Sequence, residues 1–113
     1  MESITKDGIK VESIETLEGL IGQLVQVYNP GRRGYVAGVL KKVEPTKRMK
    51  GDEEIKDVTI YLKNGVERPD KPIPLSLYEK MQRTGKTVPE VFIPRTKERG
   101  IRYMLLLEVP EEE

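Results

Sequence analysis

LIGQLVQVYNPGRRGYVAGVLKKVE, residues 20–44, is the stretch that decides the fold. In its first part apolar and polar side chains alternate, with Val25 and Val27 at every second position. A period of two is typical of a half-buried β-strand. Asn29, Pro30 and Gly31 then interrupt the pattern with residues that suit a turn. Alternation resumes from Tyr35 to Val43. The stretch therefore predicts two antiparallel strands joined by a short basic turn.

Gly38 lies in the middle of the second of these strands. A glycine inside a strand usually marks a bend, a bulge or a close approach of another backbone. A strongly bent second strand is how a short sheet curls into a small barrel. We therefore predict a mainly β fold: a small, strongly bent antiparallel β-barrel of about five strands with two short helices.

The segments on either side of this strand pair provide the next elements. The spacing of Ile14, Leu17, Leu20 and Ile21 predicts a helix at about 13–20. Residues 45–54 read as a polar loop, and alternation over 58–63 predicts a third strand. Asn64-Gly65 follows it, and this dipeptide is a strong signal for a hairpin turn.

The last third of the chain begins with prolines at 69, 72 and 74, which predict an irregular segment. Ser76 and Glu79 form a capping-box pattern that opens a helix over 76–84, and Gly85 would end it. Two further strands are expected at 88–93 and 101–109. Met104 and Leu106 make the last strand apolar on both faces, which places it in the centre of a core or at a subunit contact. We accordingly expect a homo-oligomer.

Composition limits the classes of function. The 113 residues form one domain, 1–113, without Cys, His or Trp, so disulfides, Cys/His zinc sites and histidine or thiol catalysis are excluded. We expect no enzyme, no metal and no cofactor. No apolar run approaches the roughly 18 residues of a membrane span, and a cytoplasmic protein is the natural interpretation. High Lys and Glu without Cys is also the bias of thermophile proteins.

Charge is unevenly distributed along a chain whose net charge is only +1. Residues 31–50 hold seven Lys/Arg and one Glu, and residues 80–102 hold seven Lys/Arg and two Glu. Acidic segments separate these two blocks. Either the blocks form a basic face or they are solvated surface, and the sequence leaves the two interpretations open.

Two short motifs resemble binding sites but fit structural roles better. Gly85-Lys86-Thr87 copies the end of a phosphate-binding loop, but position 80 is Lys where that motif needs Gly, and the motif here closes a helix instead of opening one. Asp52, Glu53 and Glu54 have carboxylates that Mg²⁺ prefers, yet they fit a solvated turn better.

The order of elements resembles the Sm-like small-barrel family. The local match comprises Leu20-x-Gly22, Val25-x-Val27 and Tyr35-x-x-Gly38-x-Leu40, and the acidic residue Glu44 follows it. A second match is Arg99-Gly100-Ile101-Arg102-Tyr103, which is similar to the family's Arg-Gly segment. The resemblance covers about half the chain and implies a small barrel that forms rings and contacts RNA. Gly38 falls one residue late, 46–56 lacks the family's pocket Asn, and 66–87 would be an insertion. The strand pair is also similar to a KOW segment, another RNA-contacting motif.

Nucleic-acid binding, RNA before DNA, is the function that these features favour. Basic loops would contact phosphates, and tyrosines would stack on unpaired bases or serve only as packing residues. The alternative is a protein-assembly or adaptor module in which residues 69–74 dock a partner and the last strand pairs edge to edge. The candidate phosphate contacts are Arg32, Arg33, Lys47, Arg48, Lys50, Lys97, Arg99 and Arg102, and the candidate stacking residues are Tyr28, Tyr35 and Tyr61.

Overall fold

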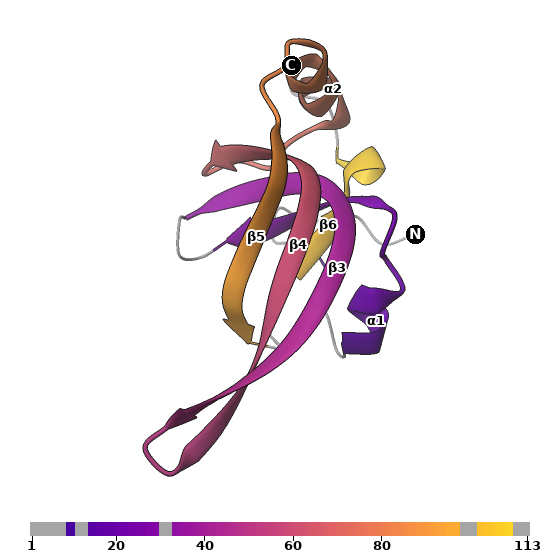
Figure 1. The fold of residues 1–113 in the computed structure, drawn as a ribbon. Coiled ribbons are helices and arrows are strands. Elements are labelled where there is room, and N and C mark those ends of the chain that lie inside the picture. The colour runs from indigo at the N-terminus through magenta and orange to yellow at the C-terminus, as the bar shows by residue number, and fades with distance from the viewer. Residues whose placement is uncertain (1–8, 11–13, 30–32, 98–101, 110–113) are drawn as a thin grey trace.

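The computed structural model describes residues 9–10, 14–29, 33–97 and 102–109 (Figure 1). These residues form one antiparallel sheet in the order β1-β6-β2-β3-β4-β5 and two short helices, so the prediction of a mainly β fold is confirmed. The elements are β1 (Ile9–Lys10), α1 (Ile14–Glu18), β2 (Leu24–Asn29), β3 (Gly34–Lys50), β4 (Glu53–Pro69), α2 (Leu75–Arg83), β5 (Val88–Lys97), β6 (Arg102–Leu105) and a 3₁₀ turn, η1 (Leu106–Glu108).

The strand pair predicted from residues 20–44 is present as β2 and β3. Their register runs from Leu24 opposite Val39 to Asn29 opposite Gly34. The pairing of β3 with β4 shifts between Ala37 and Val39. A side chain at Gly38 would place its Cβ 2.9 Å from the carbonyl oxygen of Lys63. The predicted bulge with a close backbone approach is therefore confirmed.

The loop predicted at 45–54 is wrong, because β3 and β4 continue through it as a long hairpin of two 17-residue strands. The end of this hairpin, residues 47–56, extends beyond the sheet as a twisted ribbon, which we call the arm (Figure 1). Gly51, with φ at +63°, lies in its turn. Most side chains of the arm are exposed, so its sequence lacks the apolar alternation that reveals a half-buried strand.

The hairpin turn predicted at Asn64-Gly65 is also wrong, because β4 runs through it to Pro69. Asn64 does adopt the left-handed conformation expected of such a dipeptide, with φ at +54°, but β4 uses it where its pairing with β3 is shifted. A side chain at Gly65 would collide with Val91 of the neighbouring β5. The local preference was identified correctly, and the strand bends there instead of ending.

The predicted helices are present with different ends. α1 covers 14–18 instead of 13–20 and buries Leu17. α2 begins at Leu75 after Pro74, and no side chain caps it, so the capping box predicted from Ser76 is wrong. Its end matches the prediction: Gly85 has φ at +69°, and its N–H donates to the Gln82 carbonyl at 3.2 Å.

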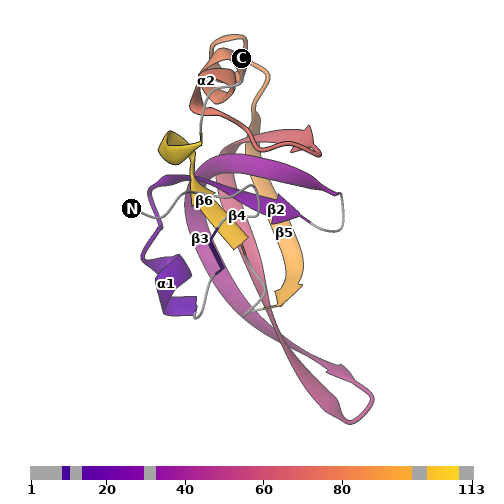
Figure 2. The same ribbon diagram turned by 180° about the vertical axis from the view of Figure 1, so that it is seen from behind.

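The last two strands do not pair with each other. β5 is longer than predicted and pairs with β4, whereas β6 is shorter than predicted and lies between β1 and β2 (Figure 2). In the residues that the structure describes, no pairing joins β5 to β1 or β6. The described sheet is therefore open, although it is strongly bent (Figure 1).

Two apolar clusters pack on opposite faces of this sheet, because successive strand residues alternate between the faces. We call the face that carries Ile60 and Leu62 the inner face, and the opposite side the outer face. Met104 and Leu106 are buried in the outer cluster, so the last strand is apolar on both faces because both cores of the same chain use it. The outer cluster consists of Tyr35, Ala37, Val66, Ile73, Tyr78, Met104, Leu106 and Val109.

None of the helices that the structure describes has the length and apolar character needed to cross a membrane.

Candidate nucleic-acid interface

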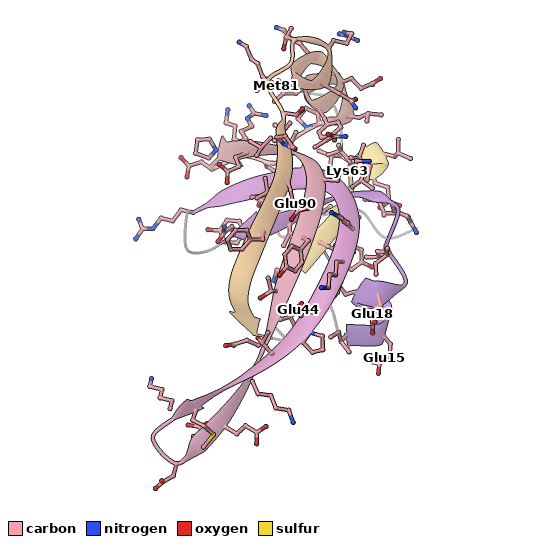
Figure 3. The ribbon with its side chains drawn as sticks, in the orientation of Figure 1. Glu15, Glu18, Glu44, Lys63, Met81 and Glu90 are labelled. Atoms are coloured by element: carbon pink, nitrogen blue, oxygen red, sulfur yellow. The ribbon has the colours of Figure 1, made fainter. Side chains whose placement is uncertain are left out.

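The outer face of the sheet has a covered half and an uncovered half. Residues 69–74, α2 and η1 contribute the side chains that close the outer cluster over β2, β6 and the adjoining ends of β3 and β4. Beyond that cluster, the outer face of β3, β4 and β5 carries polar and aromatic side chains that reach solvent (Figure 3).

An aromatic pair lies at the centre of the uncovered half. Tyr61 on β4 is the backbone partner of Phe92 on β5, and their ring centroids are 6.3 Å apart with the planes tilted by 33°. The Phe92 side chain is 61% exposed. Both residues alternate with inner-face residues such as Ile60 and Ile93, so the rings point away from the inner core. Tyr61 is half-buried and Phe92 is exposed, so the two rings form an adjacent aromatic pair at the surface.

Lysines surround these rings. Lys42 is the backbone partner of Tyr61, and its Nζ lies 5.5 Å from the centroid of the Tyr61 ring, which is within cation–π range. The pairing of β3 with β4 shifts between Leu40 and Lys42, and both Lys41 and Lys42 are exposed at this irregularity. Lys63 is exposed two residues from Tyr61 along β4.

Two carboxylates hold two of these lysines. Lys41 Nζ lies 2.7 Å from Glu90 Oε2, a contact that spans from β3 to β5, and Lys42 Nζ lies 3.0 Å from Glu44 Oε2. The hydrogen bond and charge of Glu44 raise the pKa of Lys42 above its ordinary value, so Lys42 is fully charged at neutral pH. Figure 3 shows Glu44, Lys63 and Glu90 on one side of the sheet. We call this set the platform: Lys41, Lys42, Glu44, Tyr61, Lys63, Glu90 and Phe92.

The structure does not assemble the predicted basic residues into one surface. Arg33 immediately precedes β3, and Lys50 is the last residue of that 17-residue strand, so the two are separated by its full length. Arg102 is exposed on β6. Lys97 ends β5 opposite Asp57, and Arg48 pairs with Ile55 in the arm; only their backbone positions are described. Arg32 and Arg99 lie outside the described residues.

Pairing in the arm places acidic residues beside two lysines of the first basic block. Lys47 Nζ lies 3.4 Å from Glu54 Oε1, and Lys50 is the backbone partner of Glu53. The arm thus folds residues 47–50 back against residues 53–56. Segments that are separated along the sequence become neighbours, and the local charge of +6 calculated for 31–50 is not the charge of a surface patch.

The three candidate stacking tyrosines have different surroundings. Tyr35 is buried in the outer cluster at 6% exposure and meets Tyr28 edge to face, with centroids 5.2 Å apart. Tyr35 is therefore a packing residue, and partly exposed Tyr28 packs against it. Tyr61 alone lies on the platform. Phe92 was not among the candidates, although its position between Val91 and Ile93 assigns it to the solvent side of the predicted strand.

The proline-rich segment 69–74, a candidate docking site, is exposed at residues 69–71 and buried at Ile73 and Pro74. Ile73 is fully buried, its N–H donates to Gln26 Oε1 at 2.8 Å, and its carbonyl accepts from Gln26 Nε2 at 3.0 Å. Arg68 Nη1 donates to the Pro72 carbonyl at 3.1 Å. The buried part of this segment connects β4 to α2, so it is not accessible to a partner.

A cavity of about 360 Å³ lies where β2, β3 and β4 meet near Gly34. Four of its polar or aromatic residues, Asn29, Tyr35, Glu67 and Arg68, already interact with other groups of the chain. The arrangement does not identify a ligand.

The two short motifs have structural roles. The Lys86 N–H donates to the Met81 carbonyl at 2.8 Å, so the backbone of Gly85-Lys86 closes α2 and does not present its N–H groups to a phosphate. Glu54 contacts Lys47. Within the described ranges, no three Asp or Glu side chains come together as metal ligands.

Comparison with known proteins gives no further assignment, because no protein-family model, curated protein or solved structure matches the chain.

Proposed function

We propose that this protein binds single-stranded RNA on the platform. The observation that carries the proposal is the pair of exposed Phe92 and half-buried Tyr61 at the sheet surface, with the Lys42 ammonium against the Tyr61 ring. Aromatic side chains on neighbouring strands of an antiparallel sheet are a recurrent way to stack unpaired bases. Lysines beside them can contact the phosphates that link those bases.

The platform suits a single strand better than a duplex. Bases inside a duplex are already stacked and paired, so they cannot cover protein rings without first being separated. The ring pair also lies on two strands of a sheet and not on a helix that could enter a major groove. All seven platform residues belong to one chain, so the proposed binding requires no second copy.

Binding of a fluorescein-labelled hexaribonucleotide, measured by anisotropy, tests the proposal. Base–aromatic stacking is worth about 1–3 kcal/mol per base, so Phe92→Ala and Tyr61→Ala should each weaken binding about 5- to 150-fold. Leu107→Ala is the matched control, because it removes an apolar side chain that is 75% exposed outside the platform. It should leave the affinity unchanged. A duplex of the same sequence should bind more weakly than the single strand.

Two results would reject the proposal. One is the absence of salt-sensitive binding to any single-stranded oligonucleotide. The other is binding that the double substitution Tyr61→Ala, Phe92→Ala does not weaken relative to Leu107→Ala. Circular dichroism of each variant would show that the fold is retained, as expected for Phe92 because its side chain is mostly exposed.

A further inference from the structure

Glu90 lies where its carboxylate can hydrogen-bond to the edge of a base that stacks on Phe92. The two residues lie on the same face of β5, two positions apart, which is about 7 Å along a strand. The Glu90 side chain is 47% exposed and extends toward β3, where Lys41 Nζ meets its Oε2 at 2.7 Å. A base lying on Phe92 would therefore have this carboxylate and ammonium beside it.

The pair offers a specific pattern of hydrogen-bonding groups. An ionised carboxylate only accepts, through two oxygens, and an ammonium only donates. Side by side, Lys41 and Glu90 present a donor followed by two acceptors. The Watson–Crick edge of guanine has the complementary order: the O6 acceptor, the N1–H donor and the N2–H donor. In this arrangement the Lys41 ammonium donates to guanine O6, and the N1–H and N2–H groups of guanine each donate to one oxygen of the Glu90 carboxylate.

The other bases match this pattern less well. Adenine and cytosine each bring one amino group to their Watson–Crick edge, so one carboxylate oxygen stays without a donor from the base. Uracil has a single N–H between two carbonyls, and at least one carbonyl would face the carboxylate. Resting on the proposed function, we infer that the Lys41–Glu90 pair makes the platform prefer guanine in single-stranded RNA and discriminate against uracil.

A matched control is available on the same face. Glu44 also forms an exposed pair with a lysine, Lys42, at 3.0 Å, and it lies on the β3 side of Tyr61 and away from Phe92. Glu44→Gln and Glu90→Gln remove the same charge from the same platform. Each should raise the affinity for an all-uridine oligonucleotide through reduced repulsion of phosphate, but only Glu90→Gln should change the ratio between bases.

The experiment compares UUUUUU with UUUGUU, UUUAUU and UUUCUU on the full chain by fluorescence anisotropy. Wild type should bind UUUGUU about fivefold or more tightly than UUUUUU, the lower end of what one bidentate contact to a base provides. The ratio should fall to about 1 in Glu90→Gln and stay at the wild-type value in Glu44→Gln.

Other outcomes separate this inference from the proposed function. If wild type binds all four hexamers equally and Phe92→Ala still weakens binding, the guanine preference is wrong and the platform stands. A guanine preference that persists in Glu90→Gln, or a preference for another base, also overturns the inference. If no hexamer binds, the inference and the proposed function both fail.

Discussion

At the scale of single residues, Gln26 shows how one polar side chain organises an apolar region. It lies in β2 among valines, is fully buried, and pairs both groups of its amide with the backbone of Ile73, 47 residues away. An amide side chain has one acceptor and one donating group, so it satisfies a peptide N–H and C=O as a neighbouring strand would. Gln26 thereby fixes the segment that leads into α2.

Gln26→Leu should destabilise the protein strongly. The substitution leaves the N–H and carbonyl of Ile73 buried without partners, at about 1–3 kcal/mol for each group. Urea unfolding followed by circular dichroism would measure the loss. Gln23→Leu is the control, because Gln23 is exposed just before the same strand and its substitution should change the free energy of unfolding by less than about 0.5 kcal/mol. Equal stability of the two variants would contradict the role assigned to Gln26.

Residues with strong local preferences were the most predictable from sequence. The positions of Gly38 and Gly85 were identified correctly because each preference acts within a few residues. Asn64 also adopts the left-handed φ typical of Asn in an Asn-Gly dipeptide, but whether a left-handed residue turns a chain or bends a strand depends on distant partners, here β3 and β5. The structural role of Gln26 could not be predicted, because its partner Ile73 lies in a segment whose position the sequence does not reveal.

At the scale of elements, α2 is attached to the sheet through the irregularity in β4. Tyr78 is buried on the inward side of α2, and its hydroxyl donates to the Asn64 carbonyl at 2.8 Å. The strand pairing is shifted around Asn64, and the Asn64 carbonyl accepts a hydrogen bond from Tyr78 of the helix. The bend in β4 and the position of α2 are thus coupled.

This coupling predicts a pH dependence of stability. Burial raises the pKa of Tyr78 above its ordinary value of 10.0, because the phenolate would lose its hydration. The folded pKa is therefore above the unfolded one. The stability that neutral Tyr78 contributes is complete below about pH 10 and is lost as the pH rises through the folded pKa.

Urea unfolding of wild type and Tyr78→Phe at pH 8 and pH 11 tests this prediction. At pH 8 the variant should be less stable by about 0.5–1.5 kcal/mol, the net worth of one hydrogen bond. Wild type should lose more stability than the variant between pH 8 and pH 11, because the variant cannot ionise at this position. Parallel losses would show that Tyr78 ionises in the folded state as it does in the unfolded one.

The arm marks the limit of sequence-based prediction for elements. Alternation of apolar and polar residues identified β2, the start of β3 and the centre of β4, because one face of each is lined by apolar side chains of the inner cluster. The arm has mostly exposed side chains and is held by the β3–β4 pairing and by contacts such as Lys47 to Glu54. Its residues therefore have the composition of a loop, and only the continuous β3–β4 register shows that they form paired strands.

At the scale of the whole molecule, strand pairing redistributes charge. Two lysines of the first basic block lie beside carboxylates from other strands, in the pairs Lys41–Glu90 and Lys47–Glu54. What distinguishes one surface is the Tyr61–Phe92 aromatic pair with lysines around it, not an excess of positive charge. Tyr61 was a sequence-based candidate for this surface, whereas Phe92 and Lys42 could be added only when the registers of β3, β4 and β5 were known.

The most direct test of the platform is to map binding residue by residue. Backbone amide signals of ¹⁵N-labelled wild-type protein would be followed by nuclear magnetic resonance during titration with UUUGUU. The platform predicts that the largest shifts fall in residues 41–44, 59–63 and 88–93, on three strands that adjoin in the sheet. Shifts concentrated in residues 30–33 and 97–102 or in the arm, with residues 59–63 and 88–93 unchanged, would contradict the account and return the interface to the basic loops.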